Sequence, residues 1–305
     1  MTIIDETYKE GYSTPLLEYG GRMDIKSMVV EDIIKAAAFI VMYVVLFLVA
    51  KFLKDFLIPY KINHELTKED NLAVALAMCG YYLASAAIFV GALLGPTQGF
   101  FEDMIAVGGY SLLGLVLLNC SRWFNDKAIL RTFCDTEQLM KEKNVGVGAV
   151  HCGAYLATGL IAAGAVSGQG GGIVSCIVFF ILGQLSLVLF SLIYEKFSSY
   201  NVHAELLQKN TASGIAFGGN LIALSIVIMN AASGNFTSWK QDITLFLIYN
   251  LIAFVFLPVI RLVMDRLVVL GDSLGREIRD DKNIGAGFLE ATVAIIFAVI
   301  LTILL

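Results

Sequence analysis

The sequence predicts an all-α membrane protein with eight spanning helices, built as a parallel internal duplication of two four-helix halves. Three observations predict this fold: an apolar composition, eight long apolar runs and a gap-free repeat. Of the 305 residues, 58% are hydrophobic and 15% are charged, and the mean hydropathy is +0.78. Soluble domains carry about 25% charged residues, so the composition alone already favours a membrane protein.

The apolar runs have the length of transmembrane helices. A spanning helix needs roughly 20 apolar residues, because about 30 Å of hydrocarbon is crossed at about 1.5 Å per residue. Transmembrane β-strands would be about half as long and would alternate in polarity. Eight runs meet the helical criterion: 33–53, 72–95, 101–121, 145–166, 172–194, 211–233, 241–264 and 284–305.

The repeat relates the two halves at a fixed offset. A shift of 139 residues places Arg122 on Arg261 and His151 on Glu290, and maps residues 28–166 onto 167–305 without a gap. A second shift, of 73 residues, places Asn71 on Asn144 within the first half. The unit is therefore a helix, a charged connector and a helix started by Asn, and it occurs four times. We divide the chain into a polar tail (1–30) and two four-helix membrane repeats (31–166 and 167–305).

The positive charges predict the orientation. The four long connectors and their helix ends hold 16 of the 21 Lys and Arg residues, whereas the three short connectors hold only Lys240. The positive-inside rule then places the long connectors in the cytoplasm and both termini outside. Because each half has an even number of spans, the halves share one topology, as in parallel repeats. The connectors interleave apolar and charged residues, which predicts short amphipathic helices at the membrane surface.

Several classes of function find no support. The first 30 residues lack a basic segment followed by an apolar one, so no cleaved signal peptide is expected. The five cysteines, among them Cys134 in a polar connector, show no CxxC or Cys/His zinc spacing. We expect no metal, no cofactor and no disulfide framework. A net charge of −5 without a basic tail argues against nucleic-acid binding. GxSxG, HExxH and P-loop motifs are absent, so an enzyme is not expected.

The repeated Asn residues predict helix starts. Each stands where a polar connector becomes an apolar helix, and Asn is among the best N-cap residues. The predicted N-caps are Asn71, Asn144, Asn210 and Asn283. A ring of Asn side chains lining a vestibule is the functional alternative, and the two roles are compatible.

Positions +2, +9, +13 and +20 after each Asn are mostly small, although the fourth unit departs from this pattern at Ile296. In the second unit they are Gly146, Gly153, Ala157 and Gly164. At about 100° per residue these positions form one stripe. Small stripes let membrane helices approach closely, so the stripe predicts helix packing.

One position breaks the fourfold pattern with titratable residues. Seven residues after the Asn stand His151 in the second unit and Glu290 in the fourth, matched by the 139-residue shift. Ionisable groups inside membranes cost several kcal/mol unless paired or hydrated, and a His near a carboxylate titrates near neutral pH. The functional hypothesis is a polar pathway, as a facing pair or as two separate sites, formed by His151, Glu290, Asn144, Asn283, Tyr155 and Tyr82. The alternative is interfacial snorkelling or a structural polar contact.

Two further charge patterns recur. Arg122 and Asp126, like Arg261 and Asp265, are four residues apart where helices leave the bilayer, which favours local helical ion pairs. His64 and His203 recur in the connectors. We expect both to face solvent or lipid headgroups, with pH sensing as the alternative.

These features resemble the bacterial YjfL-like family of inner-membrane proteins, a family without established activity. The resemblance rests on the tandem two-helix units and on connectors that end in KNVGVG, KNIGAG and EDNLAVA. It covers nearly the whole chain from about residue 30. It implies a location in the bacterial cytoplasmic membrane and assigns no site residue.

Two functions remain in view. The first is a channel or secondary transporter for a small ion or protons, with the Asn, His, Glu and Tyr face lining the path. The second is a non-transporting membrane scaffold or envelope-stress partner whose basic connectors dock lipid or a peripheral protein. An enzyme is a distant third. The expected partners are the lipid bilayer, a cytoplasmic peripheral protein and, through the face of position +7, a second copy of the chain.

Overall fold

The computed structural model describes residues 25–129, 135–267 and 273–305. It divides into two units, Met1–Val41 and Met42–Leu305. In the first, the described residues belong to the first turns of helix α1. The described residues form these α-helices: α1 (Ile25–Leu57), α2 (Ile62–Thr67), α3 (Leu72–Leu93), α4 (Phe100–Ala128), α5 (Asp135–Met140), α6 (Val145–Ser167), α7 (Gly172–Phe197), α8 (Val202–Leu207), α9 (Thr211–Ala232), α10 (Trp239–Leu267), α11 (Leu274–Arg279) and α12 (Ile284–Leu304).

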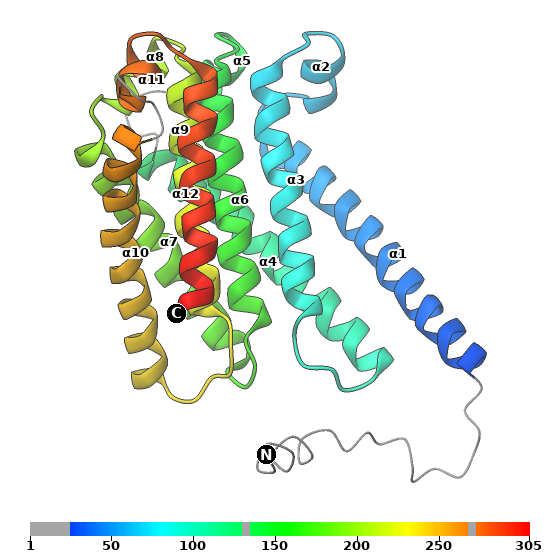
Figure 1. The fold of residues 1–305 in the computed structure, drawn as a ribbon. Coiled ribbons are helices and arrows are strands. Elements are labelled where there is room, and N and C mark those ends of the chain that lie inside the picture. Colours follow the sequence, from blue (N-terminus) through cyan, green and yellow to red (C-terminus); the bar gives the residue numbers. More distant parts are fainter. Residues whose placement is uncertain (1–24, 130–134, 268–272) are drawn as a thin grey trace, which may run out of the picture. The chain divides into compact units, whose positions relative to one another are not determined.

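Eight of these helices are long and apolar enough to cross a membrane, which confirms the predicted all-α, eight-span fold. They are α1, α3, α4, α6, α7, α9, α10 and α12. The remaining four helices, α2, α5, α8 and α11, have six residues each and lie one in each long connector. All four lie at the same end of the spanning helices (Figure 1), as two halves of equal topology require. Most of the predicted tail (1–30) and Cys134 lie outside the described residues.

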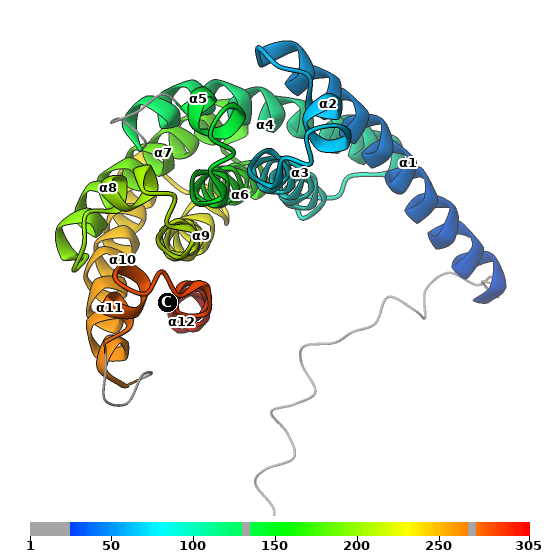
Figure 2. The same ribbon diagram turned by 90° about the horizontal axis from the view of Figure 1, so that it is seen from above.

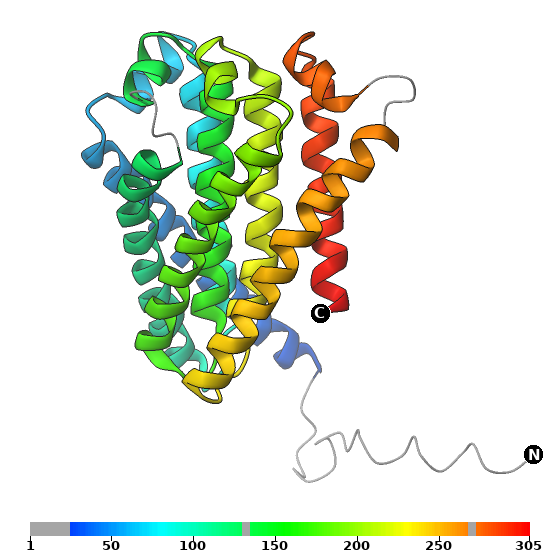
Figure 3. The same cartoon turned by 90° about the vertical axis from the view of Figure 1, so that its left-hand side faces the viewer.

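The spanning helices of Met42–Leu305 form two rows. The inner row is α3, α6, α9 and α12, each packed against the next in chain order. Helices α4, α7 and α10 cover one side of this row and contact pairs of inner helices (Figure 2). Helix α10 runs obliquely to the inner helices (Figure 3). The outer helix α10 therefore meets the inner row at an angle.

The inner helices pack backbone to backbone through glycine. A Cβ built on Gly80 would meet the backbone of Cys152, and one built on Gly153 the backbone of Gly218, both nearer than the 3.0 Å that real Cβ atoms keep. These glycines belong to the predicted stripe, which faces the following inner helix. A second small face, at positions +4 and +8 from the Asn, meets the preceding helix. On this face a Cβ at Gly148 would lie 2.5 Å from the Ala73 carbonyl oxygen.

Asn side chains tie each inner helix to two connectors. The residue before each Asn has positive φ (Asp70, Lys143, Lys209 and Lys282). This turn lets the side-chain oxygen of the Asn accept an N–H of the first helical turn. The side-chain amide donates to the short helix just before it and, in three cases, to a carbonyl of the next connector: Leu139, Leu206 and Ile278. The connectors are thus linked in a row above the inner helices.

Candidate functional site

Two small cavities with a few polar side chains in a mainly apolar lining lie between the rows, one in each half. The second cavity is lined by Asn220, Leu257, Ile260, Arg261, Asp265, Leu274, Glu290, Val293 and Ala294. The first cavity is lined by Leu118, Arg122, Asn125, His151, Ala154, Tyr155 and Thr158. Five lining positions correspond under the 139-residue shift, including Arg122 with Arg261 and His151 with Glu290. Each cavity leaves about 10 Å³ for the centre of a water molecule. The repeat therefore places a cavity at the corresponding position in each half, with different side chains lining it.

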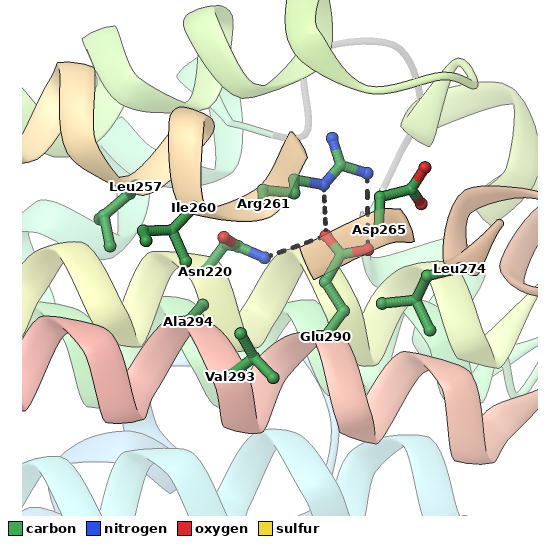
Figure 4. A pocket seen from close by; sticks show the side chains of 9 residues that line it. All are labelled: Asn220, Leu257, Ile260, Arg261, Asp265, Leu274, Glu290, Val293 and Ala294. Atoms are coloured by element: carbon green, nitrogen blue, oxygen red, sulfur yellow. Dashed lines mark hydrogen bonds and ion pairs between the residues drawn. The ribbon is translucent and has the colours of Figure 1, made fainter. Parts of the chain in front are cut away.

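The second cavity contains a buried ion pair. Arg261 Nε donates to Glu290 Oε1 at 2.7 Å, and the second Glu290 oxygen lies 3.5 Å from the guanidinium (Figure 4). The Tyr194 hydroxyl and the Asn220 amide also donate to Glu290 Oε1, at 2.7 and 3.2 Å. The side chains of Arg261 and Glu290 are only 10% and 5% exposed. A buried carboxylate is stable as an anion when it is paired and hydrogen-bonded in this way.

Four different spanning helices contribute to this pair. Arg261 comes from α10, Glu290 from α12, Asn220 from α9 and Tyr194 from α7. The Tyr194 ring lies 4.6 Å from the guanidinium carbon, a cation–π distance. The site therefore fastens the outer helices α7 and α10 to the inner helices α9 and α12.

Tyr200, which follows α7 outside the spans, adds a second ring to the site. Its centroid lies 5.9 Å from the Arg261 guanidinium carbon. The side chain is 5% exposed. Burial, assisted by the negative charge of Glu290, raises the pKa of the Tyr200 hydroxyl above its usual value. Tyr200 is therefore held in its neutral form beside the ion pair.

The predicted local pair between Arg261 and Asp265 is wrong. Asp265 accepts the backbone N–H of Gly275 at 2.8 Å, and Arg261 pairs across helices with Glu290. The oblique path of α10 turns the arginine toward α12, so a tertiary partner replaces the local one. The matching prediction for Arg122 and Asp126 involves a side chain, that of Asp126, outside the described residues.

The first cavity holds His151 at the position of Glu290. His151 is 4% exposed, and its Nε2 lies 3.8 Å from a carboxylate oxygen of Asp135 on the connector helix α5. That separation is longer than a direct hydrogen bond. One turn along α6, the Tyr155 ring lies 6.0 Å from the His151 ring. The site thus connects the connector surface with the membrane interior through one titratable imidazole.

A buried lysine extends this cluster. Lys54, at the end of α1, is 2% exposed and donates a hydrogen bond to the Tyr155 hydroxyl. Its ammonium nitrogen lies 4.2 Å from the centroid of the Tyr155 ring and 4.7 Å from that of Tyr81. Asn119 in turn donates to the Tyr81 hydroxyl at 3.1 Å. Polar side chains therefore follow one another in a string from Asp135 to Asn119, with hydrogen bonds between Lys54 and Tyr155 and between Asn119 and Tyr81, and with wider separations at His151.

Of the predicted pathway residues, the structure brings His151 and Tyr155 together. Glu290 lies in the other cavity, so the two titratable residues form separate sites. The amides of Asn144 and Asn283 point to the connectors, where they donate to Gln138 and Glu277. Tyr82 packs on Phe47, with ring centroids 4.7 Å apart.

The expectation for the connector histidines holds for His64, which is exposed, and fails for His203. The His203 ring is buried, with Nδ1 2.7 Å from Glu195 and Nε2 2.9 Å from the Ile129 carbonyl. Tertiary packing of α8 against the ends of α4 and α7 encloses it. Sequence reasoning also missed Lys54 as a site residue, because its position at the end of an apolar run is typical of an interfacial anchor.

The metal-binding side chains and the cysteines of the described residues are dispersed or unpaired. Among the described residues, no three His, Cys, Asp or Glu side chains gather at metal-binding distance. Cys79, Cys120, Cys152 and Cys176 are free thiols.

Comparison with known proteins places the chain in a family. The chain is 22% identical to the UPF0719 transmembrane protein of Aquifex aeolicus (strain VF5) over 236 residues, which is 76% of this chain and 85% of the relative. No solved structure matches. The profile of the family described as Domain of Unknown Function (DUF350) matches twice, at residues 28–166 and 170–305. These findings support an uncharacterised transmembrane family, without specifying the narrower YjfL-like group. With both halves matched across nearly its whole length, the chain belongs to the DUF350 family of membrane proteins.

Proposed function

We propose that this protein moves protons across the membrane, with the His151 cluster as the proton-exchanging site. One observation carries the proposal: His151, Tyr155 and Lys54 are buried together within a spanning bundle, and the carboxylate of Asp135 on the connector helix α5 lies 3.8 Å from His151. Intramembrane ionisable residues that face the protein interior are typical of ion pathways and proton relays. His is the side chain whose usual pKa lies closest to neutral pH.

The size of the cavity favours protons over other ions. About 10 Å³ for a water centre corresponds to about one water molecule. A hydrated sodium or potassium ion does not fit such a space, whereas a proton passes between hydrogen-bonded groups. The Arg261–Glu290 pair has a different character. Its carboxylate is fully engaged by donors from three helices, so we assign it a structural role in the second half.

The expected orientation of the chain gives the string a direction. His151 lies seven residues after Asn144, the N-cap of α6, about 10 Å deep at about 1.5 Å per residue, and Asp135 lies on the connector side. Under the positive-inside rule this end faces the cytoplasm. We propose a bacterial cytoplasmic membrane with the four long connectors inside and both termini outside. Protons would then exchange with the cytoplasm through Asp135.

Reconstitution into liposomes tests the proposal. Purified protein in vesicles that contain a pH-sensitive dye should dissipate an imposed pH gradient faster than empty vesicles do. His151→Ala should reduce that rate toward the empty-vesicle value, because the exchanging group is gone. Asn201→Ala, which changes the N-cap of α8, a residue that lines neither cavity, is the control and should leave the rate unchanged. Wild-type vesicles no faster than empty ones would refute the proposal.

A scaffold is the alternative, and one observation favours it. The connectors form a continuous charged row in which Lys143 reaches Glu69 and Lys209 reaches Glu142. Together with the amide links to Leu139, Leu206 and Ile278 this makes a fixed platform for a peripheral protein or for lipid headgroups. Folded protein that shows no proton flux, yet recruits anionic vesicles or a cytoplasmic protein through its connectors, would decide for this alternative.

A further inference from the structure

The first cavity adjoins a polar network whose hydrogen bonds are incomplete. Asn125 on α4 donates to Thr158 on α6 at 3.1 Å and to Gln184 on α7 at 3.0 Å. Asn125 and Gln184 are each 5% exposed. Within the described part of the chain, the remaining oxygen of Asn125 and the remaining nitrogen of Gln184 are buried without a hydrogen-bond partner. An unsatisfied buried polar group costs about 1–3 kcal/mol.

Rotating the amide groups does not remove this deficit. The oxygen and nitrogen of a side-chain amide can trade places when the amide group rotates by half a turn. If the Asn125–Gln184 hydrogen bond is to be kept, both amides must be rotated together. After the exchange one donor and one acceptor are again left over. In either arrangement the leftover Asn125 atom, whose residue lines the cavity, needs one partner: a donor for its oxygen or an acceptor for its nitrogen. Water is the molecule that satisfies this requirement.

The cavity beside Asn125 has the size and the polarity for such a water. It leaves about 10 Å³ for a water centre, and a cavity needs about 10–15 Å³ by this measure and two to four polar partners to hold one molecule. Asn125, Thr158, Tyr155 and His151 all line it. Arg122, which also lines the cavity, disfavours a metal cation in the same place. The chemistry thus selects a neutral water.

We infer that the first cavity binds an ordered water molecule that joins the Asn125–Gln184–Thr158 network to the His151–Tyr155 string. This water extends the polar string from α6 to α4 and α7, deeper into the bundle. The inference rests on the proposed function only for the role of the water as a proton carrier. The binding site itself stands on the cavity and on the unsatisfied amide atoms.

The second cavity provides the contrast. It leaves the same space for a water centre, about 10 Å³, yet its carboxylate already accepts hydrogen bonds from Arg261, Tyr194 and Asn220. None of the side-chain atoms that line it is among the unpartnered buried atoms of the described residues. At the position of Asn125 the repeat has Met264. The unsatisfied amide of Asn125 has no counterpart among the described residues that line the second cavity, so we expect the ordered water in the first.

Radiolytic labelling tests this difference. Hydroxyl radicals formed from water by an X-ray pulse oxidise buried side chains only where a bound water lies beside them, and peptide mass spectrometry locates the products. Leu118 and Leu257 are matched residues, because they correspond in the repeat, line the two cavities and are 1% and 2% exposed. We expect Leu118 to be oxidised several-fold faster than Leu257. In Asn125→Met, which copies the second half, the rate at Leu118 should fall to that of Leu257.

Equal rates at Leu118 and Leu257 in the folded wild-type protein would overturn the inference. So would an unchanged rate at Leu118 in a folded Asn125→Met variant. The wild-type comparison decides the question even where the variant does not fold. Labelling requires no transport, so a protein with an oxidised Leu118 and no proton flux would keep the water site and refute the proposed function.

Discussion

Neutralising Glu290 is the perturbation whose magnitude follows most directly from the structure. In Glu290→Gln the shape of the side chain is kept, but Arg261 remains charged and 90% buried without an anion. Glu290 accepts close hydrogen bonds from Arg261 at 2.7 Å, Tyr194 at 2.7 Å and Asn220 at 3.2 Å. The amide oxygen of Gln keeps one or two of these, and each lost bond to a charged group is worth about 1.5–3 kcal/mol.

We therefore expect Glu290→Gln to lower the free energy of unfolding by about 3–5 kcal/mol, the range for breaking one side of a buried pair. Unfolding in mixed micelles, followed by circular dichroism, measures this change. Asp265→Asn is the matched control. It alters the carboxylate four residues from Arg261, and its amide oxygen can still accept the Gly275 N–H, so a loss of less than about 1 kcal/mol is expected.

A double variant separates the stranded charge from general damage to packing. Adding Arg261→Met to Glu290→Gln removes the uncompensated guanidinium, so the double variant should recover at least about 2 kcal/mol of the loss. Two results would refute a buried ion pair between Arg261 and Glu290. One is a Glu290→Gln variant within about 1 kcal/mol of wild type. The other is a double variant that is less stable than Glu290→Gln alone and than Arg261→Met alone.

Three further predictions concern packing, capping and pH. Gly153→Ala should destabilise the protein by about 1–3 kcal/mol or more, because its new Cβ meets the Gly218 backbone. In Gly109→Ala the new Cβ has nothing within 4 Å, so the stability should be unchanged or rise by up to about 1 kcal/mol. Denaturant titration measures both changes. Asn210→Ala should cost about 2–4 kcal/mol because it removes a helix cap and leaves the Ile278 carbonyl unpaired, and Asn201→Ala, which only caps α8, about 1 kcal/mol. Because burial raises the pKa of the Tyr200 hydroxyl, the unfolded chain loses this proton before the folded protein does as the pH rises past about 10. The free energy of unfolding should therefore fall there by about 1.4 kcal/mol per pH unit, and Tyr200→Phe should remove this contribution to the pH dependence. Equal slopes of unfolding free energy against pH for both proteins between about pH 9 and 11 would count against a neutral, buried Tyr200.

The spans and the Asn caps could be predicted because their causes are local. A run of about 20 apolar residues has the length that a helix needs to span a bilayer. An Asn before such a helix lies next to the unpaired N–H groups of the first turn. The first small face was visible for the same reason. The second small face is also present in the sequence, because the second glycines of KNVGVG and KNIGAG are Gly148 and Gly287. One stripe of small residues already explains contact with one neighbour. A second face is needed only because each middle helix of the inner row packs between two others.

The partners of the charged residues could not be predicted, because they depend on which helices become neighbours. Arg261 has an acidic residue one turn away and pairs instead with Glu290, 29 positions along the chain. Lys54 ends an apolar run, as interfacial anchors do, yet it is enclosed between Tyr81 and Tyr155. In both cases the packing of one row of helices on the other decides the outcome, and a single sequence does not encode that order locally.

Proton flux through vesicles that contain wild-type protein or His151→Gln, compared at equal protein content, tests the central claim most directly. Gln keeps a polar side chain of similar size but cannot carry a proton at neutral pH. The account predicts that wild-type protein collapses an imposed pH gradient and that His151→Gln slows this by about a hundredfold, the typical effect of losing a positioned proton-exchanging group. Equal flux for the two proteins would contradict the role of His151.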